Sequence, residues 1–236
     1  MIKIFELLIR ADGVSHEEML SGLTDAAACL KAVRALRGFN VQEALPLPAR
    51  KDIVQLNVPA DVDGFAEFWV DDVADYAAAM DDPAAADWRA ARARLCGAAR
   101  TLVLRENPLI PVPADRPPTR NNAFLTRNAR FETSEAFLHE WLIGHGAMCL
   151  TIPYLKAFVP CVVTDRLPPM DLPELPTDEI EGIAQAYFDT PEDEIAMIQT
   201  PEAKEWFAHG AITFGLIKAF GARETVASIP AEAQAA

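Results

Sequence analysis

The sequence predicts an α+β fold made of two ferredoxin-like β-α-β-β-α-β repeats that pack sheet to sheet. Two pairs of similar segments support this prediction: DGFAEFWVDD (63–72) resembles EGIAQAYFDT (181–190), and PAAADW (83–88) resembles PEAKEW (201–206). Both pairs are separated by 118 residues. Strand-like and helix-like segments also follow one another in the same order in both halves. A shared order at a fixed offset indicates an internal duplication.

The first repeat opens with IKIFELLIR, an apolar stretch typical of a strand. Ser15 and Glu18 then form an S-x-x-E capping box, which predicts the start of a helix. Apolar residues at even spacing predict the later strands, and a region rich in Ala and Arg is expected to be helical with a break near Pro83. The predicted elements are strands at residues 2–10, 39–44, 64–70 and 100–106, and helices at 15–37 and 73–95.

The second repeat is predicted to follow the same plan. Its strands alternate apolar and polar residues, and prolines mark the starts of its last two helices. The predicted elements are strands near residues 123–131, 157–164, 180–188 and 224–229, and helices near 134–151, 191–199 and 201–220.

A ferredoxin-like unit has an antiparallel sheet with helices on one face, so its other face is apolar and must be covered. Two copies in one chain solve this by packing sheet against sheet and closing a barrel-like sandwich. We expect the repeats to span residues 1–107 and 123–236. The segment between them, 108–122, contains five prolines and is expected to be an extended, semi-rigid linker.

The composition bounds the function. The 236 residues carry a formal net charge of −14, which repels phosphate backbones and anionic lipid headgroups and argues against nucleic-acid and membrane partners. The four cysteines show no C-x-x-C spacing, so we expect them to be reduced core residues. Neither a signal peptide nor an apolar run of about 18 residues is found, and a cytoplasmic location is expected.

Several of these residues resemble the EthD family. A capped helix beginning at Ser134 carries the pattern W-x-x-x-H-G at Trp141, His145 and Gly146, and both halves carry a D/E-G-x-A-x-x-x-F/V-D strand followed by a P-E/A-x-x-x-W helix. The resemblance covers most of the chain. It implies a dimeric α/β-barrel fold, built here from a tandem pair. The wider group includes cofactor-free monooxygenases, cyclases, dehydratases, lactone isomerases and haem-binding enzymes, so the resemblance implies no single reaction.

The two halves are expected to differ in this motif. Aligning Ser15 with Ser134 places Gly22 opposite Trp141 and an alanine opposite His145. Large apolar replacements would be expected if the pair served only to fill a core. We therefore predict that the first repeat has a degenerate site and that the second repeat retains the Trp/His motif.

His145 is the predicted catalytic residue. It lies four positions after Trp141, so both side chains share one helical face. Burial on that face is expected to keep the imidazole neutral, so that it takes a proton from a C–H or O–H group or returns one to a leaving group. Trp141 is predicted to form a flat wall for an aromatic substrate. The alternative is a purely structural histidine in a packed core.

Three further residues are predicted to bind substrate in the same cavity, from strand or helix ends: Tyr154, Tyr187 and Arg127. Packing or rim roles are the alternative for each. His209 is a candidate for the mouth of the pocket, whereas His139 and His16 are expected at the surface. Cys149 follows His145 by four residues and makes a Cys–His dyad a weaker alternative. No metal-ligand motif or nucleotide-binding motif is found, so no cofactor is expected, with haem as the alternative.

Two functional hypotheses follow. The first is a cofactor-free enzyme of the lyase, cyclase, isomerase or oxygenase type, in which His145 acts as general acid or base on a hydrophobic, aromatic or polyketide-like compound. The second is a non-catalytic accessory or binding protein of a degradation or biosynthetic pathway. A hydrophobic small molecule is the expected partner in both cases, and the chain is expected to be a monomer or a homodimer.

Overall fold

The computed structural model of the chain describes residues 1–49, 51–58 and 62–230. Side-chain caps start the helices of the first repeat: the Oγ of Ser15 accepts a hydrogen bond from the Glu18 backbone N–H, and Asp72 caps the next helix in the same way. The elements are β1 (Ile2–Arg10), α1 (His16–Ala26), η1 (Ala27–Ala32), β2 (Gly38–Pro46), β3 (Val54–Gln55), β4 (Gly64–Val70), α2 (Val73–Asp81), η2 (Pro83–Ala85), α3 (Ala86–Leu95) and β5 (Cys96–Glu106).

The second repeat follows the same order. Its last two helices start with proline at the first position, after the capping residues Thr190 and Thr200. The elements are β6 (Thr119–Arg127), α4 (Ser134–His139), η3 (Glu140–His145), α5 (Gly146–Met148), η4 (Cys149–Thr151), β7 (Ala157–Leu167), β8 (Gly182–Phe188), α6 (Pro191–Met197), α7 (Pro201–Thr213) and β9 (Phe214–Ser228).

The strands form a closed antiparallel barrel. Their order is β2-β4-β1-β5-β7-β8-β6-β9, and a further pairing of β9 with β2 closes the ring, while the short β3 joins β9 in parallel. Each repeat supplies four strands in the ferredoxin-like order, and the repeats meet at two seams, β5–β7 and β2–β9. The predicted fold class is confirmed. Closure pairs the strand edges of the two repeats with each other.

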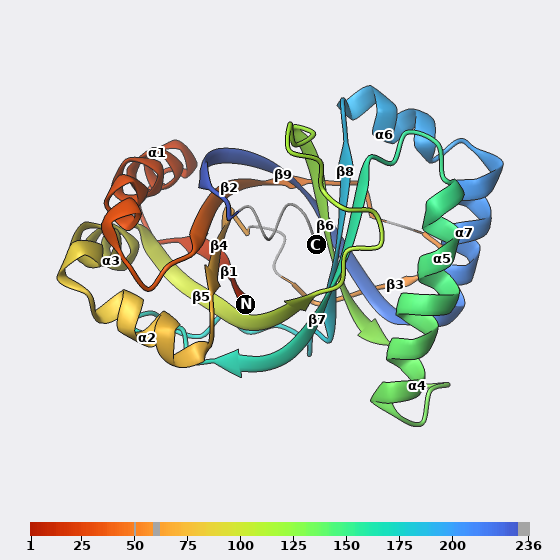
Figure 1. The fold of residues 1–236 in the computed structure, drawn as a ribbon, viewed down its shortest axis with the longest axis horizontal. Helices are drawn as coiled ribbons and strands as arrows, with labels where there is room; N and C mark the ends of the chain where they lie inside the picture. The colour runs from red at the N-terminus through yellow and green to blue at the C-terminus, as the bar shows by residue number, and fades with distance from the viewer. Residues whose placement is uncertain (50, 59–61, 231–236) are drawn as a thin grey trace.

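The helices of the two repeats lie on opposite sides of the barrel (Figure 1). Odd-numbered residues of β1 point into the barrel, where Phe5 packs against Phe65 and Phe124 with ring centroids 5.4 and 5.8 Å apart. Even-numbered residues such as Ile4 and Leu8 point outward, into the core beneath α1–α3. Each large apolar side chain buried in this way contributes about 1.5–3 kcal/mol. The barrel interior and the two helix-covered layers are therefore three separate places where a site can form.

Several boundaries differ from the sequence prediction. The first helix ends at Ala26 and continues only as the 3₁₀ turn η1, short of residue 37. Helix α7 ends at Thr213, so residues 214–220 belong to the long strand β9. Strand β6 begins at Thr119, within the segment predicted as a linker. In the last two cases pairing with a neighbouring strand outweighs local helix or loop propensity.

The predicted alignment of the two first helices is wrong by one residue. Ser134 is the first helical residue, and Thr133 is the cap whose Oγ1 accepts from the Ala136 backbone N–H. Matching the caps Ser15 and Thr133 places Leu23 opposite Trp141. Leu23 is fully buried in the core. A large apolar residue therefore does replace the tryptophan in the first repeat, contrary to the expectation of an empty space.

Among the described residues, no helix combines the length and apolar character needed to cross a bilayer.

Candidate functional site

The predicted catalytic residue His145 is packed among aromatic rings. Its side chain is 3% exposed, and its ring stacks against Trp206 with centroids 5.2 Å apart and against His209 at 5.4 Å. The edge of Phe214 closes a third side at 5.0 Å. The predicted burial is therefore present, while the space next to the ring is occupied by side chains.

His145 belongs to a hydrogen-bonded chain that ends on a carboxylate. Its Nδ1 lies 3.2 Å from Nδ1 of His209, and Nε2 of His209 lies 3.2 Å from Oε1 of Glu140. The Nε2–H of His209 can donate to the carboxylate, and Nδ1 of His209 can then accept from the Nδ1–H of His145.

The His145 ring occupies a place that is filled differently in the first repeat. Gly210 lies next to it, since a Cβ at this glycine would be 3.3 Å from Cε1 of His145. The residue 118 positions earlier is Arg92, whose guanidinium is buried and bonds both carboxylate oxygens of Glu6 at 2.8 and 3.1 Å. One repeat therefore fills its helix-covered layer with an ion pair and the other with an imidazole.

The segment that carries His145 is a π-helical turn, η3. Such wide turns often occur at functional sites. Trp141, in the same turn, is fully buried, and its ring lies directly over Gly182, where a Cβ would come within 2.3 Å of it. It also stacks on Phe137 with centroids 5.7 Å apart. The ring of Trp141 thus packs against the sheet in this structure.

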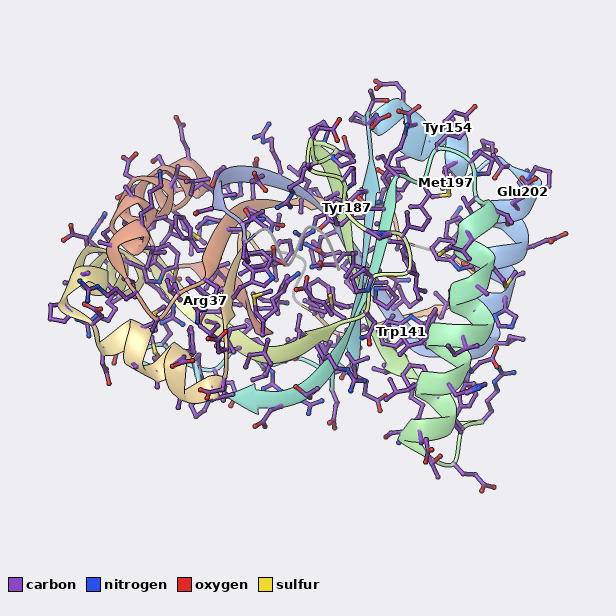
Figure 2. The ribbon with its side chains drawn as sticks, viewed as in Figure 1. Arg37, Trp141, Tyr154, Tyr187, Met197 and Glu202 are labelled. Carbon is purple, nitrogen blue, oxygen red and sulfur yellow. The ribbon has the colours of Figure 1, made fainter. Side chains whose placement is uncertain are left out.

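Among the other predicted site residues, Tyr154 and Tyr187 lie apart from Trp141 and from each other (Figure 2). Tyr154 is 46% exposed, in the turn before β7, and adopts φ of 68°. Arg127, at the end of β6, pairs with Glu181 at 3.6 Å. Tyr187 is buried and points into the barrel. These three residues do not share a cavity with His145.

The remaining histidine and cysteine candidates are placed as follows. His139 is exposed, as expected. His16 is only half-buried, but its Nδ1 lies 2.9 Å from Asp63 and its Nε2 lies 3.0 Å from Glu43. The hydrogen bond to Asp63 is the main cause that raises the pKa of His16. Burial raises the pKa of the Cys149 thiol to about 12, so this thiol is a poor nucleophile at neutral pH.

A polar network at one end of the barrel interior was not predicted. Glu67 accepts hydrogen bonds from both terminal nitrogens of Arg120 at 2.8 and 2.7 Å and from Gln185 at 2.9 Å. Lys3 lies 3.2 Å from Glu67 and donates to the Gln185 oxygen at 3.0 Å. All four side chains are buried. The Glu67 carboxylate therefore pairs with both buried cations, and Lys3 has a second carboxylate partner in Glu106.

The network is built from equivalent positions of the two repeats. Lys3 pairs with Trp69 across β1 and β4, and Arg120 pairs with Tyr187 across β6 and β8. Each cation also lies over the ring opposite it, at 4.9 Å and 5.5 Å from the centroid. Glu67 has Gln185 as its equivalent, 118 residues later. The duplication thus supplies the same frame twice with different side chains.

The pKa values follow from this arrangement. Burial opposes the charged form of each group, yet the charges of Arg120 and Lys3 hold the pKa of Glu67 well below its usual value. Burial likewise disfavours the Lys3 ammonium, but Glu106 and Glu67 outweigh it and raise the pKa of Lys3. Burial also raises the pKa of Tyr187, which keeps its phenol protonated.

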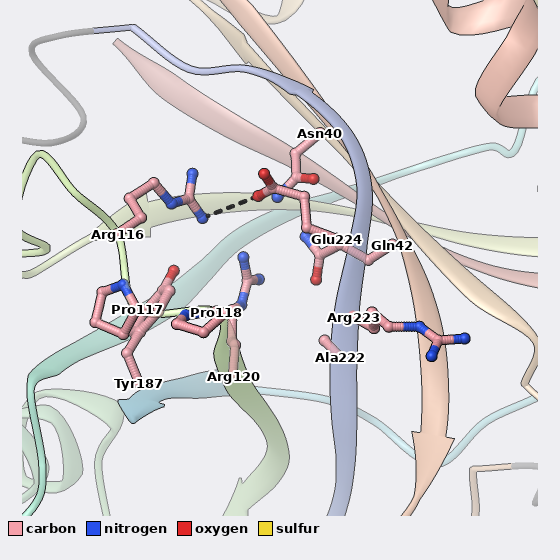
Figure 3. A pocket seen from close by; sticks show the side chains of 10 residues that line it. All are labelled: Asn40, Gln42, Arg116, Pro117, Pro118, Arg120, Tyr187, Ala222, Arg223 and Glu224. Carbon is pink, nitrogen blue, oxygen red and sulfur yellow. Dashed lines mark ion pairs between the residues drawn. The ribbon is translucent and has the colours of Figure 1, made fainter. Parts of the chain in front are cut away.

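A cavity of about 320 Å³ opens at this end of the barrel (Figure 3). It lies at the β2–β9 seam and beneath the proline-rich segment before β6. Its volume is at the lower end of the range for ligand pockets. The polar residues that line it include Asn40, Gln42, Arg116, Arg120, Tyr187 and Glu224.

The equivalent place at the β5–β7 seam is almost filled. It holds a space of about 10 Å³ lined by Lys3, Trp69 and Glu106, and it adjoins the first cavity, because Arg116 and Tyr187 line both. Glu106 pairs with Lys3 at 2.5 Å and accepts from the Trp69 indole at 2.8 Å. Neither of these two cavities has a histidine in its lining. We call the first the open mouth and the second the closed mouth.

The sequence contained one signal for this network. Lys3 and Glu67 interrupt strands that are otherwise apolar on their inward face, as IKIFELLIR and GFAEFWV show. Charged residues are almost never fully buried unless they are paired. Two such residues with opposite charge, in strands expected to be neighbours, therefore indicated a buried ion pair.

A search against protein families tests the resemblance. Residues 16–95, which run from α1 to the end of α3, match the model of the EthD domain. The match thus falls on the repeat without the Trp/His motif, and the matched segment includes His16, Glu67 and Trp69 but not His145.

The likeness to solved structures covers both repeats, not only residues 16–95. A monooxygenase-like protein from Lactobacillus acidophilus NCFM has a TM-score of 0.61 and 10% identity, with 97% of this chain and 96% of that one covered. An anthrone oxidase-like protein has a TM-score of 0.61 and 11% identity, with 98% and 94% covered. A mutant chlorite dismutase from Candidatus Nitrospira defluvii has a TM-score of 0.51 and 11% identity, with 99% and 94% covered. These likenesses establish the barrel fold. No curated protein matches the sequence.

Proposed function

We propose that this chain is a small-molecule enzyme that works by acid–base chemistry at His145 in its second repeat. The observation that carries the proposal is the hydrogen-bonded chain from Glu140 through His209 to His145. The fold is one that solved monooxygenase-like and anthrone oxidase-like proteins share. A reaction of the lyase, cyclase, isomerase or oxygenase type would share one step, the transfer of a proton to or from His145.

The chain of groups suits that step. The imidazole of His145 takes a proton from the substrate, and the electron pair of the broken C–H or O–H bond stays on the substrate. The positive charge that forms is stabilised through His209 by the Glu140 carboxylate, because the two rings are joined at 3.2 Å. His209 is half-buried, so it also connects the enclosed ring to solvent.

The surroundings favour an aromatic or otherwise hydrophobic substrate. Trp206 and Phe214 pack against His145, and Phe158 packs against Trp206. Because Trp206 covers one face of the His145 ring, the proposal requires Trp206 to move when substrate binds. Among the described residues, the indole N–H of Trp206 is buried without a hydrogen-bond partner. No hydrogen bond to that N–H holds the ring in place, and a polar group of the substrate can satisfy it.

The test is turnover by three single variants on a panel of aromatic and polyketide-like compounds. His145→Ala and His209→Ala are expected to lower turnover by about 10²–10⁴-fold, the usual contribution of a positioned acid or base. The exposed His139→Ala is the matched control and should retain full turnover. Wild-type turnover that survives His145→Ala in a folded protein would overturn the proposal.

A non-catalytic binding function is the second candidate. The observation that favours it is the enclosure of His145, together with an open cavity elsewhere at the barrel mouth. In that case a compound incubated with the protein would be recovered unchanged by mass spectrometry, and His145→Ala would alter neither its affinity nor its structure. Chemical conversion of the compound that depends on His145 would exclude this function.

The residues around His145 do not fit a haem. An axial histidine needs a slot beside its ring nitrogen wide enough for a porphyrin, whereas this ring is enclosed by Trp206, His209 and Phe214. No group of three or more potential metal ligands is found in the part of the chain that the structure describes. Haem titration followed at the Soret band tests this point, and a bound spectrum that is lost in His145→Ala would contradict it.

A further inference from the structure

The open mouth contains two buried hydrogen-bond acceptors without partners. Asn40 and Gln42 are each 1% exposed, and their side-chain nitrogens donate to Oε2 of Glu67 at 3.2 and 2.7 Å. Among the described residues, Oδ1 of Asn40 and Oε1 of Gln42 have no hydrogen-bond partner. A buried acceptor left unpaired costs about 1–3 kcal/mol. Such a cost is expected where a ligand completes the site.

The orientation of both amides is fixed by charge. Rotating either amide by half a turn would place its oxygen against the Glu67 carboxylate, and two acceptors repel. Glu67 therefore holds both N–H groups toward itself and turns the two oxygens away. At the equivalent positions of the second repeat, opposite β8, lie Val159 and Cys161, which offer no such acceptors. Of the two mouths, only the open one therefore has this pair of amide oxygens, from Asn40 and Gln42.

Arg116 supplies the opposite chemistry. Its side chain is 18% exposed and is paired with Glu224 at 3.4 Å, and Glu224 is itself 42% exposed. A single long ion pair whose carboxylate is exposed contributes little, about 0–1 kcal/mol. By contrast, Arg120 is committed to Glu67 through two short bonds. Arg116 is therefore the guanidinium that is available to bind a carboxylate in the bidentate geometry that arginine favours.

The remaining walls are flat. The Tyr187 ring and the proline rings of residues 117 and 118 line the cavity between the two arginines (Figure 3). The guanidinium of Arg116 lies 5.9 Å from the centre of the Tyr187 ring. A planar ligand can stack in this space, with its acid group at Arg116 and its donor group toward β2.

We propose that the open mouth binds a small planar carboxylic acid that carries a hydroxyl or amino group beside the acid. Arg116 binds the carboxylate, the Gln42 and Asn40 oxygens accept from the hydroxyl or amino group, and Tyr187 stacks on the ring. The lining comes from β2, β6, β8, β9 and the preceding proline-rich segment, and no residue of α4–α7 takes part. The site is therefore independent of the histidine chain, and its test does not depend on turnover.

The experiment measures binding of three related probes to the full chain by calorimetry and by ligand-observed NMR. The probe 2-hydroxybenzoate has both groups, benzoate lacks the hydroxyl, and 2-hydroxybenzamide lacks the charge. We expect 2-hydroxybenzoate to bind at least tenfold more tightly than either of the others. Binding of none of them with a Kd below about 10 mM would overturn the proposal. Equal binding of all three would do so as well.

Variants assign the contacts. Arg116→Ala is expected to weaken 2-hydroxybenzoate and benzoate at least tenfold and to leave 2-hydroxybenzamide within twofold. Gln42→Leu is expected to weaken 2-hydroxybenzoate and spare benzoate. The control is Arg94→Ala, because this arginine is 62% exposed, pairs with the exposed Glu18 and does not line the cavity. It should change no affinity more than twofold. If 2-hydroxybenzoate binds wild type, Arg94→Ala, Arg116→Ala and Gln42→Leu alike, the proposal is wrong.

Discussion

The open mouth and the closed mouth lie at the same end of the barrel and are formed by equivalent backbone positions of the two repeats, yet only the first contains a sizeable cavity. The closed mouth pairs Lys3 with Glu106 at 2.5 Å and fills the space with the indole of Trp69. In the open mouth the matching carboxylate, Glu224, pairs with Arg116 at 3.4 Å, and the smaller Tyr187 stands in the place of the tryptophan. A mouth whose polar groups bind one another has no need of a ligand. A mouth with unpaired acceptors and space of about 320 Å³ is suited to bind one.

The helix-covered layers show the same kind of divergence. In the first repeat Arg92 and Glu6 form a buried ion pair that is satisfied within the protein. In the second repeat Gly210 stands in the place of Arg92, and the His145 ring packs against it. The two repeats thus share the same backbone arrangement, while equivalent buried positions carry different side chains.

The largest expected loss of stability comes from giving both repeats the same residue at the centre of the polar network. Glu67→Gln copies the residue at position 185 and leaves Lys3 and Arg120 buried without their shared carboxylate. Breaking a buried pair in this way costs about 3–5 kcal/mol. Urea unfolding measures the loss. Arg37→Gln, which removes the exposed partner of Asp71, is the control and should cost less than about 1 kcal/mol.

The acid dependence of stability tests the same carboxylate. The pKa of Glu67 is lowered by folding, so its contribution is complete above the pKa of the unfolded chain and is lost as pH falls toward the folded value. The loss of Tm between pH 6 and pH 3 should therefore be smaller in Glu67→Gln than in wild type. Parallel curves for the two proteins would show that Glu67 is not the charged partner of Arg120.

A smaller effect is expected from opening the closed mouth. Trp69→Tyr removes ring volume and the indole bond to Glu106, and it reproduces the residue at position 187. We expect a loss of about 1–3 kcal/mol, because the surroundings relax only partly around a lost buried group. The lost stability is measured by urea unfolding. Wild-type stability in this variant would mean that Trp69 does not close the mouth.

The reverse change should close the open mouth at little cost. Tyr187→Trp adds ring volume into a space that already exists, so the free energy of unfolding should change by less than about 1.5 kcal/mol. Binding of 2-hydroxybenzoate is nevertheless expected to weaken at least tenfold. Calorimetry measures the affinity. An unchanged affinity would mean that Tyr187 does not contact the bound acid.

The fold could be read from local patterns, whereas the polar network could not. Strand β4 was predicted at its observed bounds, Gly64–Val70. Large apolar residues at even spacing indicate the strand, and Asp72, which caps the next helix, lies just beyond its end. By contrast, Lys3 and Gln185 meet across 182 residues, and that contact depends on strand register and barrel closure, which no local pattern encodes. The end of α7 was missed because residues 214–220 contain no proline and are as apolar as the helix before them.

The smallest effect concerns His16, the first residue of the segment that matches the EthD model. In the second repeat a serine, Ser134, follows the cap Thr133 and takes the place of His16. Because folding raises the pKa of His16, chiefly through its hydrogen bond to Asp63, its contribution is complete below the unfolded pKa and is lost as pH rises through the folded one. His16→Asn should therefore lower Tm at pH 5.5 and have little effect at pH 8.5. A matched His139→Asn variant, whose side chain is exposed, should show no such difference. An equal loss at both pH values would mean that His16 stabilises the first repeat by packing and that its charge contributes nothing to the start of α1.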